Sequence, residues 1–303
     1  MSKPVVAVVG FNGNLGRPIV NALTSHLFRN NFSLPVRVIT RDSSKVKEDE
    51  YPASDVKFYE AHDLDTYVKA LTGVNAVLDV RAVAALADLS LIEAAKKAGV
   101  TLYSPSDYGV DYYKAGEFRT LFKRKLDSAA HAKALGLQVV QFHTGFFLEG
   151  ALKAVPKLIF VDPTNKTANY PGDGSQEVTF TSLRNIGQAV AGVLSHPFNE
   201  IPEQVYIGGD IRSIKETVQT YEQVTEISLQ HQSKSVEDFV KVAQDHAAKG
   251  TLLAGFQDVL LALAVSTNSA NFSDRVSNKL ANPGDLFEWD TVSKIAPTLL
   301  SQK

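Results

Sequence analysis

The stretch Pro4-Val-Val-Ala-Val-Val-Gly10-Phe-Asn-Gly13-Asn-Leu-Gly16 joins an apolar run to a turn that contains three glycines. Apolar residues then recur at helical spacing from Ile19 to Leu23. A strand, a tight glycine turn and a helix in this order allow the N–H groups at the helix N-terminus to bind a phosphate. The stretch therefore predicts the first unit of a Rossmann-type, dinucleotide-binding sheet.

Each glycine of this turn has a separate expected role. Gly10 lets the chain turn sharply after the strand, Gly13 lets a pyrophosphate approach the backbone, and Gly16 lets the helix pack against the sheet. A glycine-rich turn without a ligand is the alternative. We expect cofactor contacts from the whole turn, namely Gly10, Asn12, Gly13, Asn14, Leu15 and Gly16.

Strand-like and helix-like segments alternate through the first half of the chain. The apolar runs of strand length are Val5–Val9, Val36–Thr40, Val56–Tyr59, Ala76–Val80, Val100–Tyr103 and Leu137–Phe142. The helix-like segments between them are Asn14–Arg29, Thr66–Leu71, Leu86–Ala98 and Phe118–Leu135. This alternation predicts an α/β protein with a doubly wound parallel sheet.

The second half has a less regular pattern. Strands are expected at Lys157–Val161, Val178–Thr181 and Gln204–Ile207, helices at Leu183–Leu194, Val236–Ala248 and Thr251–Val265, and irregular structure at Ser266–Asn282. We expect an NADP-binding Rossmann domain over residues 1–150. Residues 151–303 would form a smaller, mostly helical part that covers the substrate, with some strands returning to the main sheet.

The composition excludes several classes of function. With 44% apolar and 21% charged residues and a net charge of −2, the chain is typical of soluble globular proteins and unlike nucleic-acid binders. It has no cysteine, and its seven histidines lack ligand spacing, so no metal site is expected. The longest apolar stretch, Leu252–Val265, is too short to span a membrane, and the first strand leaves no room for a signal peptide. We expect a cytoplasmic protein without membrane or nucleic-acid partners.

The second predicted strand ends at Thr40 and is followed at once by Arg41. Sites that prefer NAD place a carboxylate here, whereas a guanidinium suits the 2′-phosphate of NADP. Lys45 and Lys47 would add positive potential. The stretch therefore predicts NADP(H), although Asp42 leaves open a ribose contact, or a solvated Arg41 that Asp42 balances.

Several motifs follow one another in a familiar order. They are the glycine turn, Thr40-Arg41, Ser104-Pro105-Ser106-Asp107-Tyr108-Gly109, Lys125, Gly172-Asp173-Gly174 and Asn185-Ile186-Gly187. In this order the chain resembles the isoflavone-reductase-like and NmrA-like branch of the short-chain dehydrogenases/reductases. That family has Pro-Ser-Glu-Phe-Gly at the stretch that begins with Ser104, Gly-Asp-Gly at Gly172–Gly174 and Asp-Ile-Gly at Asn185–Gly187. The resemblance extends to about residue 245.

The resemblance implies a reductase that transfers a hydride from NADPH to a small aromatic or unsaturated substrate. Lys125 would be its general acid or base, because Leu121 stands where the main branch of the superfamily has tyrosine. The alternative for Lys123-Arg124-Lys125 is a solvated helix face, of which helical spacing turns only one residue toward the sheet. The other function kept open is an NmrA-like, NADP(H)-sensing regulatory protein without turnover. A monomer or a homodimer fits either.

Ligands of parallel sheets bind at the carboxyl ends of the strands. We therefore expect cofactor contacts after the fourth, fifth and sixth strands from Val80, Arg81, Ser104, Pro105, Ser106, Gly145, Phe146 and Phe147, and also from Lys125. Phe147 would also wall the substrate, and Tyr108, Tyr112 and Tyr113 would present free hydroxyls to it. The alternatives are two core phenylalanines and tyrosines on a surface loop.

Overall fold

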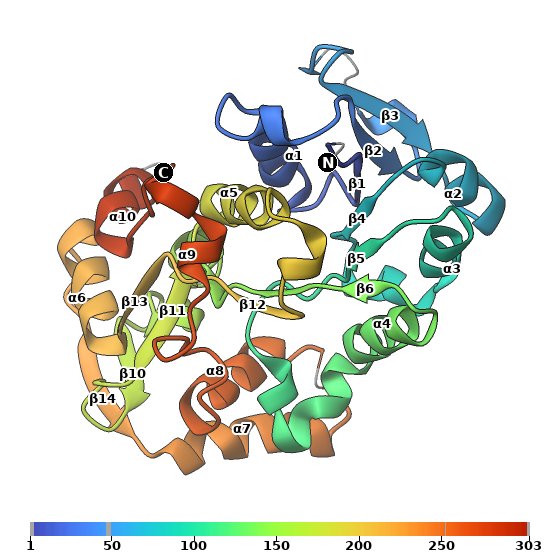
Figure 1. Ribbon diagram of the computed structural model, residues 1–303. Helices are drawn as coiled ribbons and strands as arrows, with labels where there is room; N and C mark the ends of the chain where they lie inside the picture. Colours follow the sequence, from blue (N-terminus) through green and yellow to red (C-terminus); the bar gives the residue numbers. More distant parts are fainter. Residues whose placement is uncertain (1–2, 47–49, 252, 302–303) are drawn as a thin grey trace.

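A parallel six-stranded sheet forms the centre of the computed structural model, which describes residues 3–46, 50–251 and 253–301. The strand order is β3-β2-β1-β4-β5-β6 (Figure 1). The bounds are β1 Val6–Val9, β2 Val36–Thr40, β3 Val56–Glu60, β4 Ala76–Asp79, β5 Leu102–Ser104 and β6 Gln138–Val139. The chain order reverses between β1 and β4, and this is where a doubly wound sheet opens its ligand crevice. The predicted fold class is confirmed.

Helices cover both faces of this sheet. One face carries α1 Gly16–Thr24 and α5 Leu183–Leu194, and the other carries α2 Leu64–Leu71, α3 Ser90–Lys97 and α4 Lys123–Ala134. Val6 and Val8 pack in the cluster of the first face, and Ala7 and Val9 in the cluster of the second. Burial on both faces explains why β1 is a continuous apolar run rather than an alternating one.

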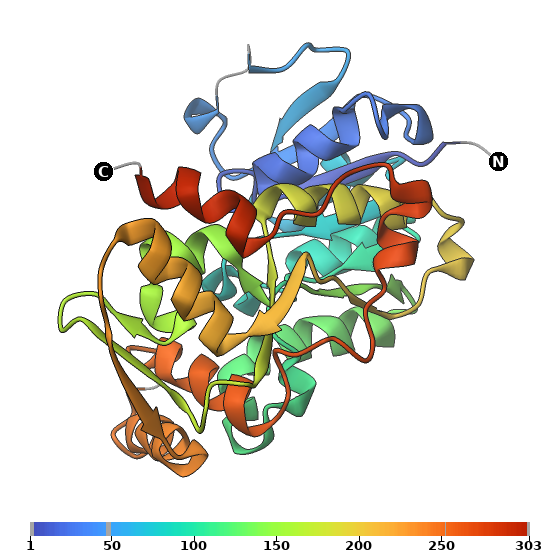
Figure 2. The same ribbon diagram turned by 90° about the vertical axis from the view of Figure 1, so that its left-hand side faces the viewer.

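Elements from the second half of the chain complete the first half. Strand β7, Gln141–His143, follows β6 after Val140 and pairs in parallel with β12, Gln204–Tyr206. Helix α5 lies along α1 (Figures 1 and 2). At Gly187 the two helices are so close that a Cβ would stand 2.3 Å from the carbonyl oxygen of Pro18. The absence of a side chain at Gly187 therefore sets the α1–α5 distance.

We expect Gly187→Ala to lower the free energy of unfolding by about 1–3 kcal/mol, because the new methyl group overpacks a backbone contact. Urea unfolding followed by circular dichroism measures this change. The control is Asn199→Ala in the exposed turn that follows the helix, for which a change within about 0.5 kcal/mol is expected. Equal stability of Gly187→Ala and the native protein would contradict this account of α5 packing.

The remaining elements build a second core beside the sheet. Strands β8 Phe146–Phe147, β11 Glu177–Thr181 and β13 Asp210–Ser213 form one small sheet, and β9 Val161–Asp162, β10 Thr167–Pro171 and β14 Gln230–Lys234 form another. The helices are α6 Ile214–Thr225, α7 Val236–Ala248, α8 Phe256–Ser266, α9 Asn278–Ala281 and α10 Val292–Ser301. Helix α10 packs on α6 (Figure 1). None of the helices in the described ranges has both the length and the apolar character to cross a membrane.

The predicted strand Lys157–Val161 is wrong. Pro156 starts a 3-10 turn, η8 (Pro156–Ile159), because its fixed φ suits a helical first position and it has no N–H for a strand ladder. Phe160 then adopts a left-handed conformation with φ of 64°, and only Val161 continues into a strand. The predicted helix Thr251–Val265 begins later, at Phe256, after Gly255.

Candidate functional site

The glycine turn connects β1 to α1 as a closed backbone structure. The Gly13 N–H donates to the carbonyl oxygen of Gly10 at 3.0 Å. Gly10 has φ of +106°, and a Cβ there would lie 2.8 Å from the backbone of Val80 and Arg81. A Cβ on Gly16 would lie 2.3 Å from Cα of Phe11. Gly10 and Gly16 are therefore required by the backbone packing of the turn itself.

Gly13 is different, because the turn does not need it to lack a side chain. A Cβ there would meet only the carbonyl oxygens of Gly10 and Val80, at 3.3 and 3.7 Å, and the residue is exposed. The first turn of α1 carries no acidic side chain, and Leu15 at its N-cap offers no side-chain acceptor. The N–H groups at this helix end are thus available to an anion, and the residues fit a pyrophosphate.

A cleft of about 560 Å³, which we call the glycine-turn cleft, opens beside this turn. Arg41 stands exposed at its wall and makes no ion pair within the described part of the chain. Asp42 accepts hydrogen bonds from the N–H and hydroxyl of Ser44, so its carboxylate holds the turn η2 (Ser43–Lys45). The side chain of Lys45 and all of Lys47 lie outside the described residues. Predicted residues that line the cleft are Gly10, Asn12, Gly13, Arg41, Val80 and Arg81.

Arg81 is a buried, charged member of the cleft wall. Its guanidinium donates twice to Asp79, at 2.9 Å in each bond, and the hydroxyl of Tyr103 donates to the same carboxylate at 2.7 Å. Burial alone would lower the pKa of Arg81, but Asp79 outweighs it and raises that pKa, so the guanidinium stays charged. The Ser106 hydroxyl donates to the Arg81 carbonyl at 2.8 Å and ties the turn after β5 to the cleft.

A second cavity, of about 240 Å³, lies on the other side of the turn after β5; we call it the aromatic cavity. Its described lining is almost entirely apolar, and Lys125 is the charged side chain in it. The lining residues are Tyr108, Gly109, Val110, Tyr112, Phe122, Lys125, Gly145, Phe146, Phe147, Gly150, Ala151, Val155, Leu158, Phe256 and Leu260. An apolar pocket with one precisely placed polar group is typical of small-molecule binding sites.

Lys125 comes from the first turn of α4, where its neighbours face solvent. Lys123 and Arg124 are exposed, and Lys123 pairs with Asp127 at 2.5 Å. Lys125 is partly buried, with its Nζ 5.3 Å from the centre of the Tyr112 ring. Burial lowers the pKa of Lys125, although the nearby carboxylates, chiefly Asp107, act in the opposite direction. A lysine with a lowered pKa gives up its proton more readily than a solvated lysine.

The structure encloses the rings of Tyr108 and Tyr112 instead of presenting their hydroxyls to a substrate or placing them on the surface, whereas Tyr113 is half-buried. Tyr108 is buried with its ring stacked on Phe142 at 5.7 Å, and Tyr112 is buried with its hydroxyl donating to the Asp107 carbonyl at 3.4 Å. The Tyr113 hydroxyl accepts a hydrogen bond from Gln141 at 2.6 Å and lies outside the aromatic cavity. Tyr108 and Tyr112 therefore contribute ring faces to the cavity, because both hydroxyls are enclosed by protein.

The loop after β7 supplies the opposite wall. Gly145 has φ of +64°, and a Cβ there would stand 2.2 Å from the carbonyl oxygen of Thr179, so only glycine fits. Phe146 and Phe147 follow, and both line the cavity. Phe146 also packs edge-on against Phe180 at 6.1 Å. The two phenylalanines belong to the core and to the cavity wall at once.

Some predicted residues line neither cavity. They are Asn14, Leu15, Gly16, Ser104, Pro105 and Ser106. Other lining residues, Phe122, Phe256 and Leu260, were not predicted. Phe122 directly precedes α4, and Phe256 and Leu260 belong to α8, far from the sheet in sequence. Apolar residues in or next to helices are typical of a core in general, so the sequence does not mark these three as cavity residues.

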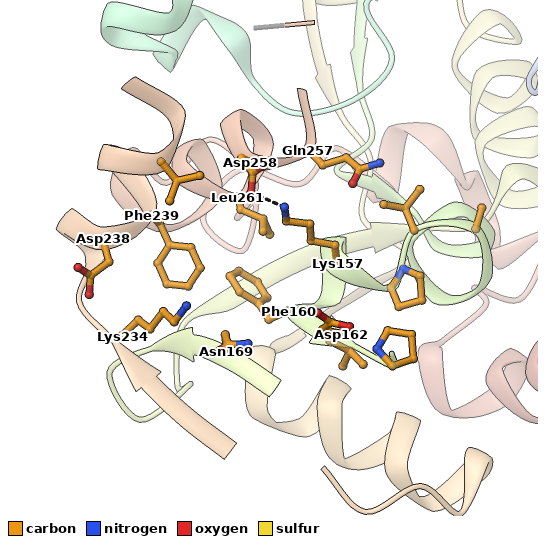
Figure 3. A pocket seen from close by; sticks show the side chains of 16 residues that line it. Lys157, Phe160, Asp162, Asn169, Lys234, Asp238, Phe239, Gln257, Asp258 and Leu261 are labelled. Carbon is orange, nitrogen blue, oxygen red and sulfur yellow. Dashed lines mark ion pairs between the residues drawn. The ribbon is translucent and has the colours of Figure 1, made fainter. Parts of the chain in front are cut away.

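A third cavity, of about 540 Å³, lies between η8 and the helices α7 and α8 and contains none of the predicted residues. Figure 3 shows Lys157 directed at Asp258, to which it is paired at 2.6 Å, with Phe160 and Phe239 nearby. Two of the charged side chains that line this third cavity are therefore already paired with each other. Across the described ranges, no group of three or more His, Cys, Asp or Glu side chains could hold a metal ion.

Comparison with known proteins identifies the family. Oxidoreductase aprR of Aspergillus flavus is 28% identical over 262 residues, which are 82% of this chain and 83% of that protein. A bifunctional pinoresinol-lariciresinol reductase of Thuja plicata is 28% identical over 255 residues, 78% of this chain and 80% of the reductase. The solved structure of AtPrR2 with NADP+ and (+)pinoresinol has a TM-score of 0.76 at 20% identity and covers 99% of both chains.

These relatives place the chain among the oxidoreductases. The model of the NmrA-like family matches residues 2–259, which include the glycine turn, Arg41, Lys125 and the loop after β7. The chain belongs to the NmrA-like family.

Proposed function

We propose that this protein is an NADPH-dependent reductase that transfers a hydride to a small aromatic or unsaturated substrate, with Lys125 as its general acid or base. The observation that carries the proposal is Lys125, the charged residue of an otherwise apolar, aromatic cavity. The turn after β5 joins this cavity to the glycine-turn cleft, since Ser106 bonds the Arg81 carbonyl and Tyr108 lines the cavity. A dinucleotide in the cleft would thus have its reactive end near Lys125.

The cofactor assignment is supported by the cleft and by a related structure. The glycine turn offers free N–H groups to a pyrophosphate, and Arg41 offers a guanidinium without an ion pair among the described residues, at the strand end where the 2′-phosphate of NADP would lie. A solved structure of similar fold contains NADP+. Asp42, which would favour NAD, is occupied by the hydrogen bonds of its own turn.

In this proposal a bound nicotinamide supplies the hydride, and the protein supplies a proton, orientation and a dry enclosure. Lys125 in its ammonium form donates the proton to the substrate atom that gains negative charge. Phe146, Phe147 and Tyr112 hold an aromatic ring by stacking and exclude water from the transfer. The lowered pKa of Lys125 makes its proton easier to give than that of a solvated lysine.

The test is NADPH consumption by the purified protein with a panel of quinones, enals, isoflavonoids and aryl ketones, with each product identified by mass spectrometry. The proposal predicts stoichiometric reduction of at least one member. Tight NADPH binding without consumption by any member of the panel would instead support an NADP(H)-sensing protein without turnover.

Arg41→Ala is expected to weaken NADPH binding about ten- to a hundredfold and to leave NADH binding nearly unchanged. The reason is that a charge-assisted hydrogen bond contributes about 1.5–3 kcal/mol, and about 1.4 kcal/mol corresponds to tenfold in affinity. Isothermal titration calorimetry with both cofactors measures the effect. Arg119→Ala, which removes an exposed arginine remote from the cleft, is the control. Equal native affinities for NADPH and NADH would rule out the assignment of Arg41.

A further inference from the structure

The carboxylate of Asp107 is completely buried in the turn after β5, and no role has yet been assigned to it. It has 0% exposure, and Gln141 Nε2 donates to its Oδ2 at 2.5 Å. Its Oδ1 is buried and has no hydrogen-bond partner within the described residues. Burial raises the pKa of Asp107, and the charge of Lys125 is the largest influence that opposes this rise. A nearby cation is therefore what favours the ionised form of this carboxylate.

Lys125 supplies this charge, and Tyr112 connects the two groups. The Tyr112 ring lies under Lys125 Nζ, with 5.3 Å to the ring centre, while the Tyr112 hydroxyl donates to the Asp107 carbonyl. Lys125 is the strongest of the charges that act on Asp107, and Asp107 is the strongest of those that act on Lys125. The two groups form no direct ion pair among the described residues, so they interact over a longer distance past the Tyr112 ring, in buried surroundings where the attraction is poorly screened.

Other titratable groups around the pair compensate one another. Asp79 also acts on Lys125, but two hydrogen bonds from Arg81 neutralise it. His143 faces Asp107 through a chain of amides, in which Gln204 bonds both His143 and Gln141. The rings of Tyr108, Tyr112 and Tyr113 complete the surroundings, and burial raises the pKa of each of these phenols, so they stay neutral. In the part of the chain that the structure describes, Asp107 is thus the nearby carboxylate that is not neutralised by another cation and can stabilise the ammonium form of Lys125.

We propose that Asp107 is a positioning residue, whose buried carboxylate favours the charged, proton-donating form of Lys125 in the aromatic cavity. Its catalytic meaning rests on the proposed reductase function; the charge coupling itself does not. In the reaction, the N–H bond of the ammonium breaks as the proton moves to the substrate, and Lys125 becomes an amine. Water returns the proton after the product leaves, and Asp107 favours this recharging.

The direct test measures the titration of Lys125 in the protein without cofactor or substrate. Competitive acetylation with acetic anhydride across a pH series, quantified by mass spectrometry on the peptide that contains Lys125, gives its pKa. Asp107→Asn should lower this pKa by about one to three pH units, since a facing opposite charge shifts a pKa by that amount. Asp107→Glu, which keeps the charge, should leave the pKa of Lys125 close to its native value. Asp111→Asn, which removes another buried carboxylate of the same segment, should not change the pKa of Lys125.

A stability cycle covers the case in which Asp107→Asn folds poorly. Removing either partner of a buried pair leaves the other uncompensated, so Asp107→Asn combined with Lys125→Met should lose less stability than the two single losses together. Unfolding by urea measures all four proteins. Additive losses, or an unchanged Lys125 titration in Asp107→Asn, would overturn the proposal even if the protein reduces a substrate. If the pKa of Lys125 is lower in Asp107→Asn than in the native protein, but the native protein reduces no substrate, the charge coupling stands and only the reductase function is rejected.

Discussion

Lys125→Met is expected to lower turnover about 10²–10⁴-fold, the range that general acid–base catalysis contributes. Methionine keeps the approximate length and the apolar packing of the lysine stem in the aromatic cavity but has no proton to exchange. Steady-state rates with the best substrate of the panel measure the loss, and NADPH affinity should fall far less. The matched control is Lys123→Met, two residues earlier on α4, where the side chain is exposed and pairs with Asp127. Native turnover in Lys125→Met would refute the assignment.

The pH profile gives an independent reading of the same residue. If the ammonium is the proton donor, turnover falls as pH rises through the pKa of Lys125, because the amine form has no proton to give. Burial lowers that pKa, so this fall should begin at a lower pH than for a solvated lysine. In Lys125→Met, the residual turnover measured across the same pH series should not show this fall at alkaline pH.

Gly13→Val is expected to abolish NADPH binding while leaving the protein folded. The residue is exposed, and a Cβ there meets only the Gly10 and Val80 carbonyls, whereas the branched group beyond it would occupy the space beside the N–H groups of α1. The thermal shift that NADPH produces in the native protein should disappear.

The matched variant for Gly13 is Gly16→Ala, where the added methyl would collide with the backbone of Phe11. It should lower the melting temperature even without a cofactor, in contrast to Gly13→Val. A folded Gly13→Val protein with native NADPH affinity would show that the turn does not hold the phosphates.

The sheet was predictable from the sequence because its central strands β1, β4 and β5 are buried on both faces and read as largely apolar runs. Strand β2 and helix α5 have the bounds that their apolar patterns predict. Strand β14 was missed, since Gln230–Lys234 is exposed along its whole length and has no apolar residue to mark it. Helix α6 was also missed, although its capping box, Ser213 with Glu216, is a readable start signal.

The candidate site divides in the same way. Its glycine turn and the residues at strand ends could be placed by topology, because parallel strands bring their carboxyl ends to one edge. The relation of Asp107 to Gln141 and Lys125 could not, since it depends on side-chain orientation across segments 34 residues apart. Tyr112 was expected to offer its hydroxyl, but the Asp107 carbonyl already accepts it. Orientation of this kind follows from packing, which a single sequence does not reveal.

The parallel pairing of β7 with β12 also bears on how the protein is made. As the chain leaves the ribosome, the nucleotide-binding sheet has to wait for Gln204–Tyr206 before β7 gains its neighbour. Until α5 follows, the flank of α1 that packs on it remains open to water. A nascent chain of about half length therefore presents an unpaired strand edge and an apolar helix face together, the two features that favour association with other chains. Association with other chains therefore competes with folding until the second half of the chain has been made.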